Sequence, residues 1–191
     1  PDYTAARYNL GLILERQGKQ REAYQAYQEA LKQDPDFEDA LNNLGFLQTE
    51  MGKPALAERT FNHLLLVNPR NASAHFNLGL LQQKEGDFEK AVVSYRRAIE
   101  CDPSHGRAYN NLGNTLKSLG LWEEAAEAYR EAVRVAPDDF FPRYNLGRLL
   151  YEQGQYQAAA DELEKALPAH EGNATLLYLL AVAYERFDPR K

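Results

Sequence analysis

The side chains that could do chemistry are scattered along this 191-residue sequence and form no catalytic or metal-binding motif. Its four histidines lack a partner at the i, i+4 spacing of paired metal ligands; they are His63, His75, His105 and His170. The single cysteine, Cys101, cannot form an internal disulfide and has no Cys or His neighbour at zinc-site spacing. No phosphate-binding glycine loop is present. We therefore expect no enzyme activity, no metal and no cofactor.

Composition and charge also limit the classes of function. The sequence is 44% hydrophobic and 26% charged, which is typical of a globular chain with a sizeable core. Its formal net charge is -6 and its Lys and Arg residues do not cluster, so we expect no nucleic-acid partner. No apolar run approaches the roughly 20 residues of a membrane span. The sequence favours a cytoplasmic location and leaves an extracellular one open, because a leader removed before Pro1 would not be visible.

An internal repeat of 34 residues organises the sequence. The dipeptide Leu-Gly recurs at this spacing at Leu10-Gly11, Leu44-Gly45, Leu78-Gly79, Leu112-Gly113 and Leu146-Gly147, and Leu180-Ala181 continues the series in altered form. Further columns keep the same step. They are a second glycine beginning at Gly18, an alanine beginning at Ala23, an aromatic residue beginning at Tyr27 and a proline beginning at Pro35.

Each column predicts a local structure. The second glycine can adopt the left-handed conformation that ends a helix, and proline both stops a helix and disfavours helix in the residue before it. The first glycine and the alanine are expected inside helices, where small side chains let two backbones approach closely. Apolar residues recur with helical spacing between these points, for example Ala91, Tyr95 and Ile99. Each unit is therefore predicted to be a helix, a tight turn, a second helix and a loop.

With these columns the sequence resembles the tetratricopeptide repeat family, whose 34-residue unit carries Leu-Gly, Ala, Tyr or Phe, and Pro at the same spacing. The resemblance implies an all-α, right-handed superhelical solenoid of helix-turn-helix hairpins. We predict a single array, residues 1–191, with repeats at about 4–37, 38–71, 72–105, 106–139 and 140–173 and an extra helix at 174–187. The fifth repeat departs from the pattern, because it ends early at Pro168 and has Glu171 in place of the proline. Such hairpins bury their apolar faces only by stacking on their neighbours.

Asparagine precedes Leu-Gly in every full repeat, at Asn9, Asn43, Asn77, Asn111 and Asn145. In the tetratricopeptide repeat family the first helix of each hairpin lines the concave groove, so the resemblance places this column on a candidate binding surface. The column is similar to the asparagine ladder in the repeat domain of O-linked N-acetylglucosamine transferase, which holds substrate polypeptide. An amide both donates and accepts hydrogen bonds, and so can pair with the backbone of an extended peptide. The alternative is that each Asn bonds between neighbouring helices.

The column before it alternates between aromatic residues in odd repeats, Tyr8, Phe76 and Tyr144, and amides in even repeats, Asn42 and Asn110. We predict that aromatic side chains form flat contact surfaces, or aromatic shelves, that alternate with polar amide side chains along the same groove. Two glycosylation sequons, at Asn71 and Asn173, share one position of their repeats. They would carry sugar if the protein were secreted, whereas the favoured interpretation is that both residues cap the helices that follow.

Two functions are left open. The first is a non-catalytic scaffold or adaptor that binds an extended peptide or a protein segment in the concave groove. The alternative is a structural protein that polymerises head to tail through its ends. It is motivated by the last predicted helix, which is apolar around much of its circumference and includes Leu176, Leu177, Leu179 and Leu180. The favoured explanation of that helix, however, is that the sequence is part of a longer array. The expected partners are therefore a protein or peptide, or further copies of the chain.

Overall fold

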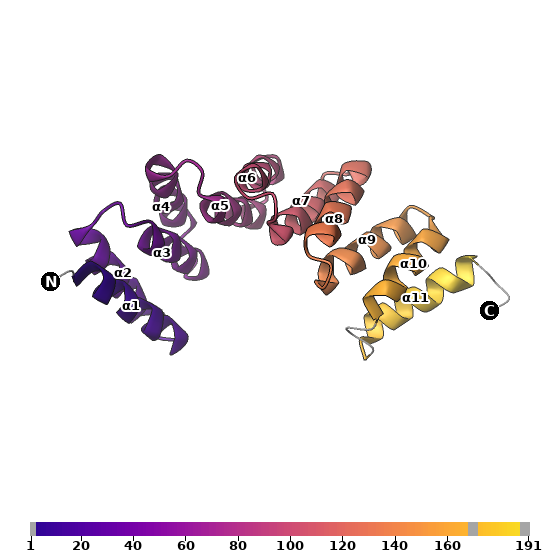
Figure 1. Ribbon diagram of the computed structural model, residues 1–191, viewed down its shortest axis with the longest axis horizontal. Coiled ribbons are helices and arrows are strands. Elements are labelled where there is room, and N and C mark those ends of the chain that lie inside the picture. Colours follow the sequence, from indigo (N-terminus) through magenta and orange to yellow (C-terminus); the bar gives the residue numbers. More distant parts are fainter. Residues whose placement is uncertain (1–2, 168–171, 188–191) are drawn as a thin grey trace. The chain divides into compact units, whose positions relative to one another are not determined.

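The computed structural model describes residues 3–167 and 172–187, and the elements among them are eleven α-helices (Figure 1). The first six are α1 (Tyr3–Arg16), α2 (Gln20–Gln33), α3 (Glu38–Glu50), α4 (Pro54–Val67), α5 (Ala72–Glu85) and α6 (Phe88–Cys101). They are followed by α7 (Gly106–Ser118), α8 (Trp122–Val135), α9 (Phe140–Glu152), α10 (Tyr156–Ala166) and α11 (Ala174–Phe187). The predicted all-α class is confirmed.

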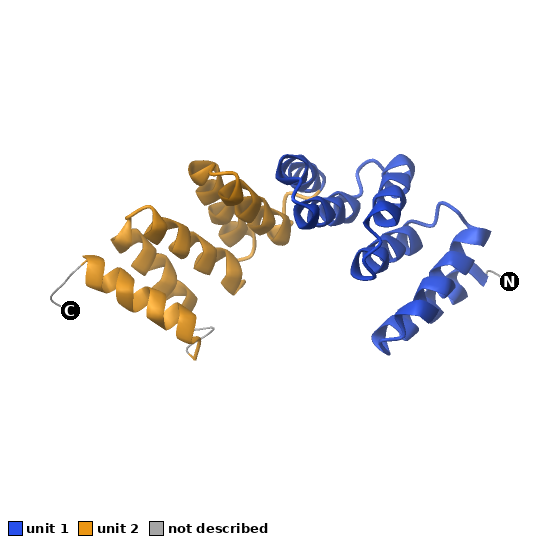
Figure 2. Cartoon of the chain, turned by 180° about the vertical axis from the view of Figure 1, so that it is seen from behind, with its two compact units in different colours: residues 1–101 blue, residues 102–191 orange. Residues whose placement is uncertain are grey.

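The helices form two compact units (Figure 2). Unit 1 is residues 1–101 with α1 to α6, and unit 2 is residues 102–191 with α7 to α11. Within each unit the most extensive packing joins the two helices of one hairpin, such as α1 with α2 or α7 with α8. We call the odd-numbered helices first helices and the even-numbered ones second helices. The prediction of one uninterrupted array depends on how the two units join, and it stays a prediction.

Glycine and proline set the helix ends as predicted. The second-column glycines have φ between 69° and 86°, the left-handed region that ends a helix without steric cost; they are Gly18, Gly52, Gly86, Gly120 and Gly154. The second helices stop two residues before a proline, for example α2 at Gln33 before Pro35. Pro168 and Glu171, which mark the predicted early end of the fifth repeat, lie outside the described residues.

The glycine of each Leu-Gly dipeptide lies against a large side chain from the second helix of the same hairpin. A Cβ added to Gly11 would stand 2.4 Å from Cε1 of Tyr27, and one added to Gly45 would stand 2.5 Å from Cε1 of Phe61. Both rings are fully buried. Because these distances leave no room for a side chain, close packing of the two helices requires glycine here.

Within unit 1, each hairpin is joined to the next by a repeated set of apolar residues. The joint between α2 and α3 consists of Ala23, Tyr27, Leu44 and Leu47, and the joint between α4 and α5 consists of Ala57, Phe61, Leu78 and Leu81. In both sets the second helix contributes the alanine and the aromatic ring, and the following first helix contributes two leucines. This buried apolar area holds neighbouring hairpins together, as the stacking argument predicts.

The first helices lie closer to one another than the second helices do. Within the units, α3 contacts α5, α7 contacts α9 and α9 contacts α11, whereas no pair of described second helices makes comparable contact. These contacts bring first helices of one unit side by side. That this side is concave and carries the asparagine column as a binding surface stays a prediction.

Candidate functional site

The asparagines before Leu-Gly bond from one first helix to the next. In unit 1, Nδ2 of Asn43 donates to the hydroxyl of Tyr8 at 3.1 Å. One hairpin further, Nδ2 of Asn77 donates to Oδ1 of Asn42 at 3.0 Å. Each bond therefore joins the asparagine column to the alternating column of the preceding hairpin, and both bonds are partly buried.

Unit 2 contains the same bond, from Nδ2 of Asn145 to Oδ1 of Asn110 at 2.9 Å. Asn111 accepts a longer bond from Asn110, at 3.5 Å, and Asn9 is exposed on α1. The amide donors of Asn43, Asn77 and Asn145 thus bond between helices, in line with the alternative interpretation of this column. The carbonyl oxygens of Asn77 and Asn145 accept no hydrogen bond from the residues that the structure describes, so they could accept one from a peptide N–H.

The aromatic members of the alternating column are buried to different degrees. Phe76 is only 4% exposed, and its ring centroid lies 5.9 Å from that of Tyr95 in the hairpin core. The predicted aromatic shelf is therefore corrected at Phe76, because its ring fills the core and offers no surface. Tyr8 and Tyr144 are half-buried, and the hydroxyl of Tyr8 is bonded to Asn43.

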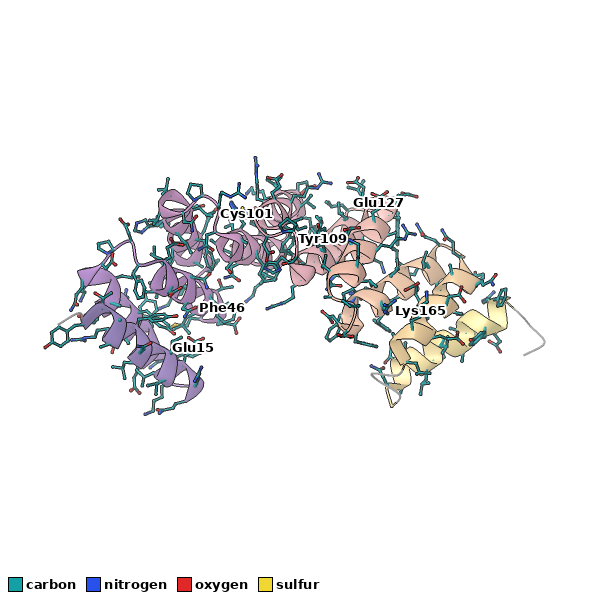
Figure 3. The ribbon with its side chains drawn as sticks, viewed as in Figure 1. Glu15, Phe46, Cys101, Tyr109, Glu127 and Lys165 are labelled. Atoms are coloured by element: carbon teal, nitrogen blue, oxygen red, sulfur yellow. The ribbon has the colours of Figure 1, made fainter. Side chains whose placement is uncertain are left out.

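A hollow of about 350 Å³ opens between α1 and α3 in unit 1. It is lined by Leu12, Glu15 and Arg16 of α1 and by Asn43 of α3. Phe46, one helical turn after Asn43, is 43% exposed; Figure 3 labels it together with Glu15. An apolar side chain, an amide and charges of both signs therefore line one hollow, and the exposed Phe46 ring stands one helical turn after the amide. Such a mixture can contact both the backbone and the side chains of a peptide.

Arg148 in unit 2 occupies the position that Phe46 has in unit 1, three residues after the asparagine of its repeat. Its Nε atom is buried and makes no hydrogen bond to any described residue. The guanidinium carbon lies 5.8 Å from the centroid of the Tyr144 ring. A carboxylate could pair with this guanidinium, because charge-assisted bonds to arginine are among the stronger polar contacts in proteins.

In three hairpins, a tyrosine of the second helix donates a hydrogen bond from its hydroxyl to a side chain of the first helix. Tyr27 donates to Glu15 at 2.6 Å, Tyr95 donates to Gln83 at 2.7 Å, and Tyr129 donates to Asn114 at 2.7 Å. Burial raises the pKa of Tyr27 and of Tyr129 well above the usual value, and the Glu15 carboxylate adds to the effect at Tyr27. The hydroxyls of Tyr27 and Tyr129 therefore stay protonated and act as structural donors.

The two sequon asparagines cap helices. Oδ1 of Asn71 accepts from the backbone N–H of Ala74 at 2.9 Å, and Oδ1 of Asn173 accepts from that of Leu176 at 3.0 Å. The capping interpretation is confirmed at both positions. Nδ2 of Asn71, the atom that a sugar would modify, also donates to Glu38 at 3.0 Å. Glycosylation stays a prediction that depends on secretion.

Comparison with known families decides the assignment. Two tetratricopeptide repeat models match residues 72–105 and 104–172, and a TPR repeat model matches residues 16–52. The chain belongs to the tetratricopeptide repeat family. Proteins of this family are generally non-catalytic, and the TPR fold is a scaffold for interactions between proteins.

Solved TPR structures share this fold. MamA is 25% identical with a TM-score of 0.76, covering 86% of this chain and 96% of its own. PilF from Pseudomonas aeruginosa is 22% identical with a TM-score of 0.83, covering 98% and 93%. YrrB, a TPR protein with an unusual peptide-binding site, is 19% identical with a TM-score of 0.74, covering 87% and 86%. No curated protein matches the sequence.

Two other kinds of site are absent from the described part of the TPR chain. Within residues 3–167 and 172–187, no three His, Cys, Asp or Glu side chains are grouped so that they could hold a metal ion. None of the described helices is suited to crossing a bilayer. The longest have 14 residues and so span about 21 Å, against a hydrocarbon core of about 30 Å.

Sequence reasoning missed Leu12, Glu15 and Arg16, which line the hollow, and Phe46, which is exposed one helical turn after Asn43. A signal was available in the repeat column that contains Phe46. Its residues are Leu12, Phe46, Leu80, Asn114 and Arg148, so the column changes from apolar to amide to cation along the TPR chain. Packing columns keep one type of residue, whereas this one varies, as expected of positions that no neighbouring hairpin constrains.

Proposed function

We propose that the chain is a non-catalytic scaffold that binds an extended segment of another protein along its first helices. The hollow between α1 and α3, with Phe46 exposed one helical turn after its lining residue Asn43, is the observation that carries this proposal. The hollow offers apolar contact through Leu12 and polar contact through Arg16 and Asn43, and Phe46 adds an exposed ring on α3. An extended peptide presents the matching groups, because its side chains alternate with backbone N–H and C=O groups.

The asparagine column supports the same proposal in a narrower form. Since the amide N–H groups of Asn77 and Asn145 bond to neighbouring helices, these residues contribute acceptor oxygens to a bound peptide. Arg148 would add a contact for an acidic side chain in unit 2. The expected ligand is therefore a peptide with an apolar residue for unit 1 and an acidic residue for unit 2.

A display selection of random peptides against the 191-residue chain would test the proposal. We expect Phe46→Ser and Arg16→Glu each to weaken the selected peptides at least about tenfold, as loss of a contact residue does. Val93→Ser is the matched control, because Val93 is an exposed apolar residue of α6, a second helix. Affinities that neither Phe46→Ser nor Arg16→Glu changes would place binding elsewhere and contradict the proposal.

The alternative function, end-to-end assembly of copies, involves other surfaces and is compatible with peptide binding. It is favoured by the exposure of the last described helix, α11, where Tyr178 is 69% exposed and Leu177 is 42% exposed. Sedimentation of the purified chain over a range of concentrations tests this alternative. A mass that stays that of one chain at every concentration would argue against it.

A further inference from the structure

Lys117 of α7 and Glu152 of α9 form an ion pair between two first helices of unit 2. Nζ of Lys117 lies 2.6 Å from both carboxylate oxygens of Glu152. The Lys117 side chain is 19% exposed and that of Glu152 is 36% exposed. The pair is more sheltered than a pair within one helix such as Lys90 with Asp87, whose side chains are 68% and 47% exposed. One cation therefore engages the whole carboxylate of Glu152.

The repeat column of Lys117 explains why it pairs with a neighbouring hairpin. In the first repeat this column holds Glu15, which accepts the hydroxyl proton of Tyr27 within the hairpin. An ammonium group has no acceptor, so Lys117 cannot do the same for Tyr129. The hydroxyl of Tyr129 donates instead to Asn114 at 2.7 Å. Lys117 is thus left without a partner in its own hairpin and pairs with α9.

Arg148 is a second cation beside Glu152. It lies four residues before Glu152 on α9, and residues at this spacing share one face of a helix. Burial raises the pKa of Tyr129, while the charge of Arg148 lowers it and that of Glu152 raises it, so both charges lie near this hydroxyl. Because Lys117 engages Glu152, the buried Nε of Arg148 has no hydrogen-bond acceptor among the described residues.

The cluster has room for a second carboxylate in its charges and its hydrogen bonds. Arg148, Lys117 and Glu152 carry two positive charges and one negative charge. A buried N–H group without an acceptor is costly, so a group that supplies one is favoured. Helix α10 offers no hydroxyl, because Leu163 stands in the column that holds tyrosine in three other repeats. A carboxylate fits best, since its two oxygens match the paired donors of a guanidinium.

We propose that unit 2 binds the carboxylate of an acidic peptide side chain between Arg148 and Lys117, and that Glu152 competes with this ligand for Lys117. The proposal rests on the peptide-binding function proposed above and adds how its contact in unit 2 is regulated. The ligand pairs first with Arg148. Lys117, whose ammonium moves on a flexible stem, then turns from Glu152 to the ligand. Glu152 therefore weakens the binding of every acidic ligand at this place.

Two short peptides test the carboxylate on the full 191-residue chain. The probes are acetyl-Ala-Ala-Glu-Ala-Ala-amide and the same peptide with Gln in place of Glu, and neither carries a large apolar side chain for unit 1. Proton–nitrogen NMR follows the Nε–H signal of Arg148, which is assigned by its absence from Arg148→Gln. We expect the Glu peptide to shift this signal with a Kd of about 0.1–10 mM, and the Gln peptide to bind at least about tenfold more weakly.

Glu152→Gln is the decisive variant, because it frees Lys117 at nearly constant side-chain size. We expect it to bind the Glu peptide at least about threefold more tightly, and a gain of this kind cannot come from a loss of folding. Lys117→Gln leaves Glu152 to pair with Arg148, so we expect binding at least about threefold weaker than in the wild type. Glu131→Gln is the matched control, because it removes the same charge from an ion pair with Arg134 on α8.

The outcomes separate this proposal from the proposed function. Equal affinities for the two peptides, or no shift of the Arg148 signal up to about 10 mM, would overturn the carboxylate site. An affinity that Glu152→Gln leaves unchanged or lowers would overturn the competition by Glu152. Neither result touches the proposed function, which Phe46→Ser and Arg16→Glu test in unit 1. Conversely, selected peptides that tolerate both of those substitutions would contradict the proposed function, while the NMR titration would still decide the site in unit 2.

Discussion

Gly79 of α5 lies beneath the ring of Tyr95 of α6, so closely that a Cβ on the glycine would stand 2.7 Å from Cε1 of the ring. The ring cannot easily move away, because it is fully buried and its hydroxyl donates to Gln83 at 2.7 Å. The pair fixes the distance between the two helices of the hairpin. Its equivalents fix the other hairpins, with Phe61 in place of tyrosine in the second and Leu163 in the fifth.

Gly79→Ala is therefore expected to destabilise the protein. Alanine is favoured over glycine in a helix by about 1 kcal/mol, but overpacking a core costs about 1–3 kcal/mol, so the loss exceeds the gain. Urea unfolding measures the difference. Gly172→Ala is the control, because a Cβ at Gly172 would meet no heavy atom within 4 Å. A more stable Gly79→Ala protein would contradict the packing argument.

Tyr95→Ala removes the other half of the same contact. We expect a loss of about 3–5 kcal/mol in the free energy of unfolding, because a fully buried ring is replaced by a cavity. Tyr95→Phe keeps the ring and removes the hydrogen bond to Gln83, so it should cost about 0.5–1.5 kcal/mol. A loss below about 1 kcal/mol for Tyr95→Ala would show that the ring does not belong to the core.

The bond between Asn145 and Asn110 predicts a measurable coupling between the two residues. A double-mutant cycle with Asn110→Ala and Asn145→Ala should give a coupling energy of about 0.5–1.5 kcal/mol in unfolding, as expected for a partly buried hydrogen bond. Asn9, which is exposed on α1, is the control position. A coupling near zero, together with strong loss of peptide binding, would assign the asparagine column to ligand recognition alone.

His105 predicts a dependence of stability on pH in unit 2. Its Nδ1 accepts from the backbone N–H of Ala108 at 3.2 Å and so caps α7. Burial lowers the pKa of His105 below its ordinary value of 6.5, and the Asp102 carboxylate opposes this shift only in part. The unfolded state therefore binds the proton more tightly than the folded state, and protonation also removes the acceptor of the cap.

The stabilisation by neutral His105 is thus complete above pH 6.5 and is lost as the pH falls from there through the lower folded pKa. Thermal unfolding at a series of pH values would measure this loss. His105→Asn keeps a capping acceptor without titrating, so we expect its stability to change less over the same range. An identical pH profile for both proteins would contradict the role of His105.

The repeated columns predicted the hairpins, the turn glycines and the stacking, because each depends on a backbone constraint that only a few residue types satisfy. The partners of the buried tyrosines could not be predicted in this way. Glu15 and Gln83 occupy one repeat position, whereas Asn114, with its shorter side chain, bonds to Tyr129 from a position one helical turn earlier. Many polar side chains can satisfy one hydroxyl, so no fixed spacing marks them.

The candidate site was predicted less completely than the fold, for a related reason. The sequence placed the asparagines on the first helices, but it could not decide whether Asn77 bonds to a peptide or to Asn42, since either pairing satisfies an amide. Phe76 and Phe46 have the same side chain, and only the packed structure separates the buried ring from the exposed one.

The chain's single tryptophan, Trp122, begins α8 in unit 2, where Nζ of Lys117 lies 5.8 Å from its ring. Its fluorescence emission therefore follows the melting of residues 102–191 alone, while the circular dichroism of the helices follows both units. If both signals are recorded during one denaturation, comparing the two unfolding curves shows whether the molecule unfolds in one cooperative step or in more than one. Coincident curves mean that the chain melts as one block, and separated curves mean that one half survives the loss of the other.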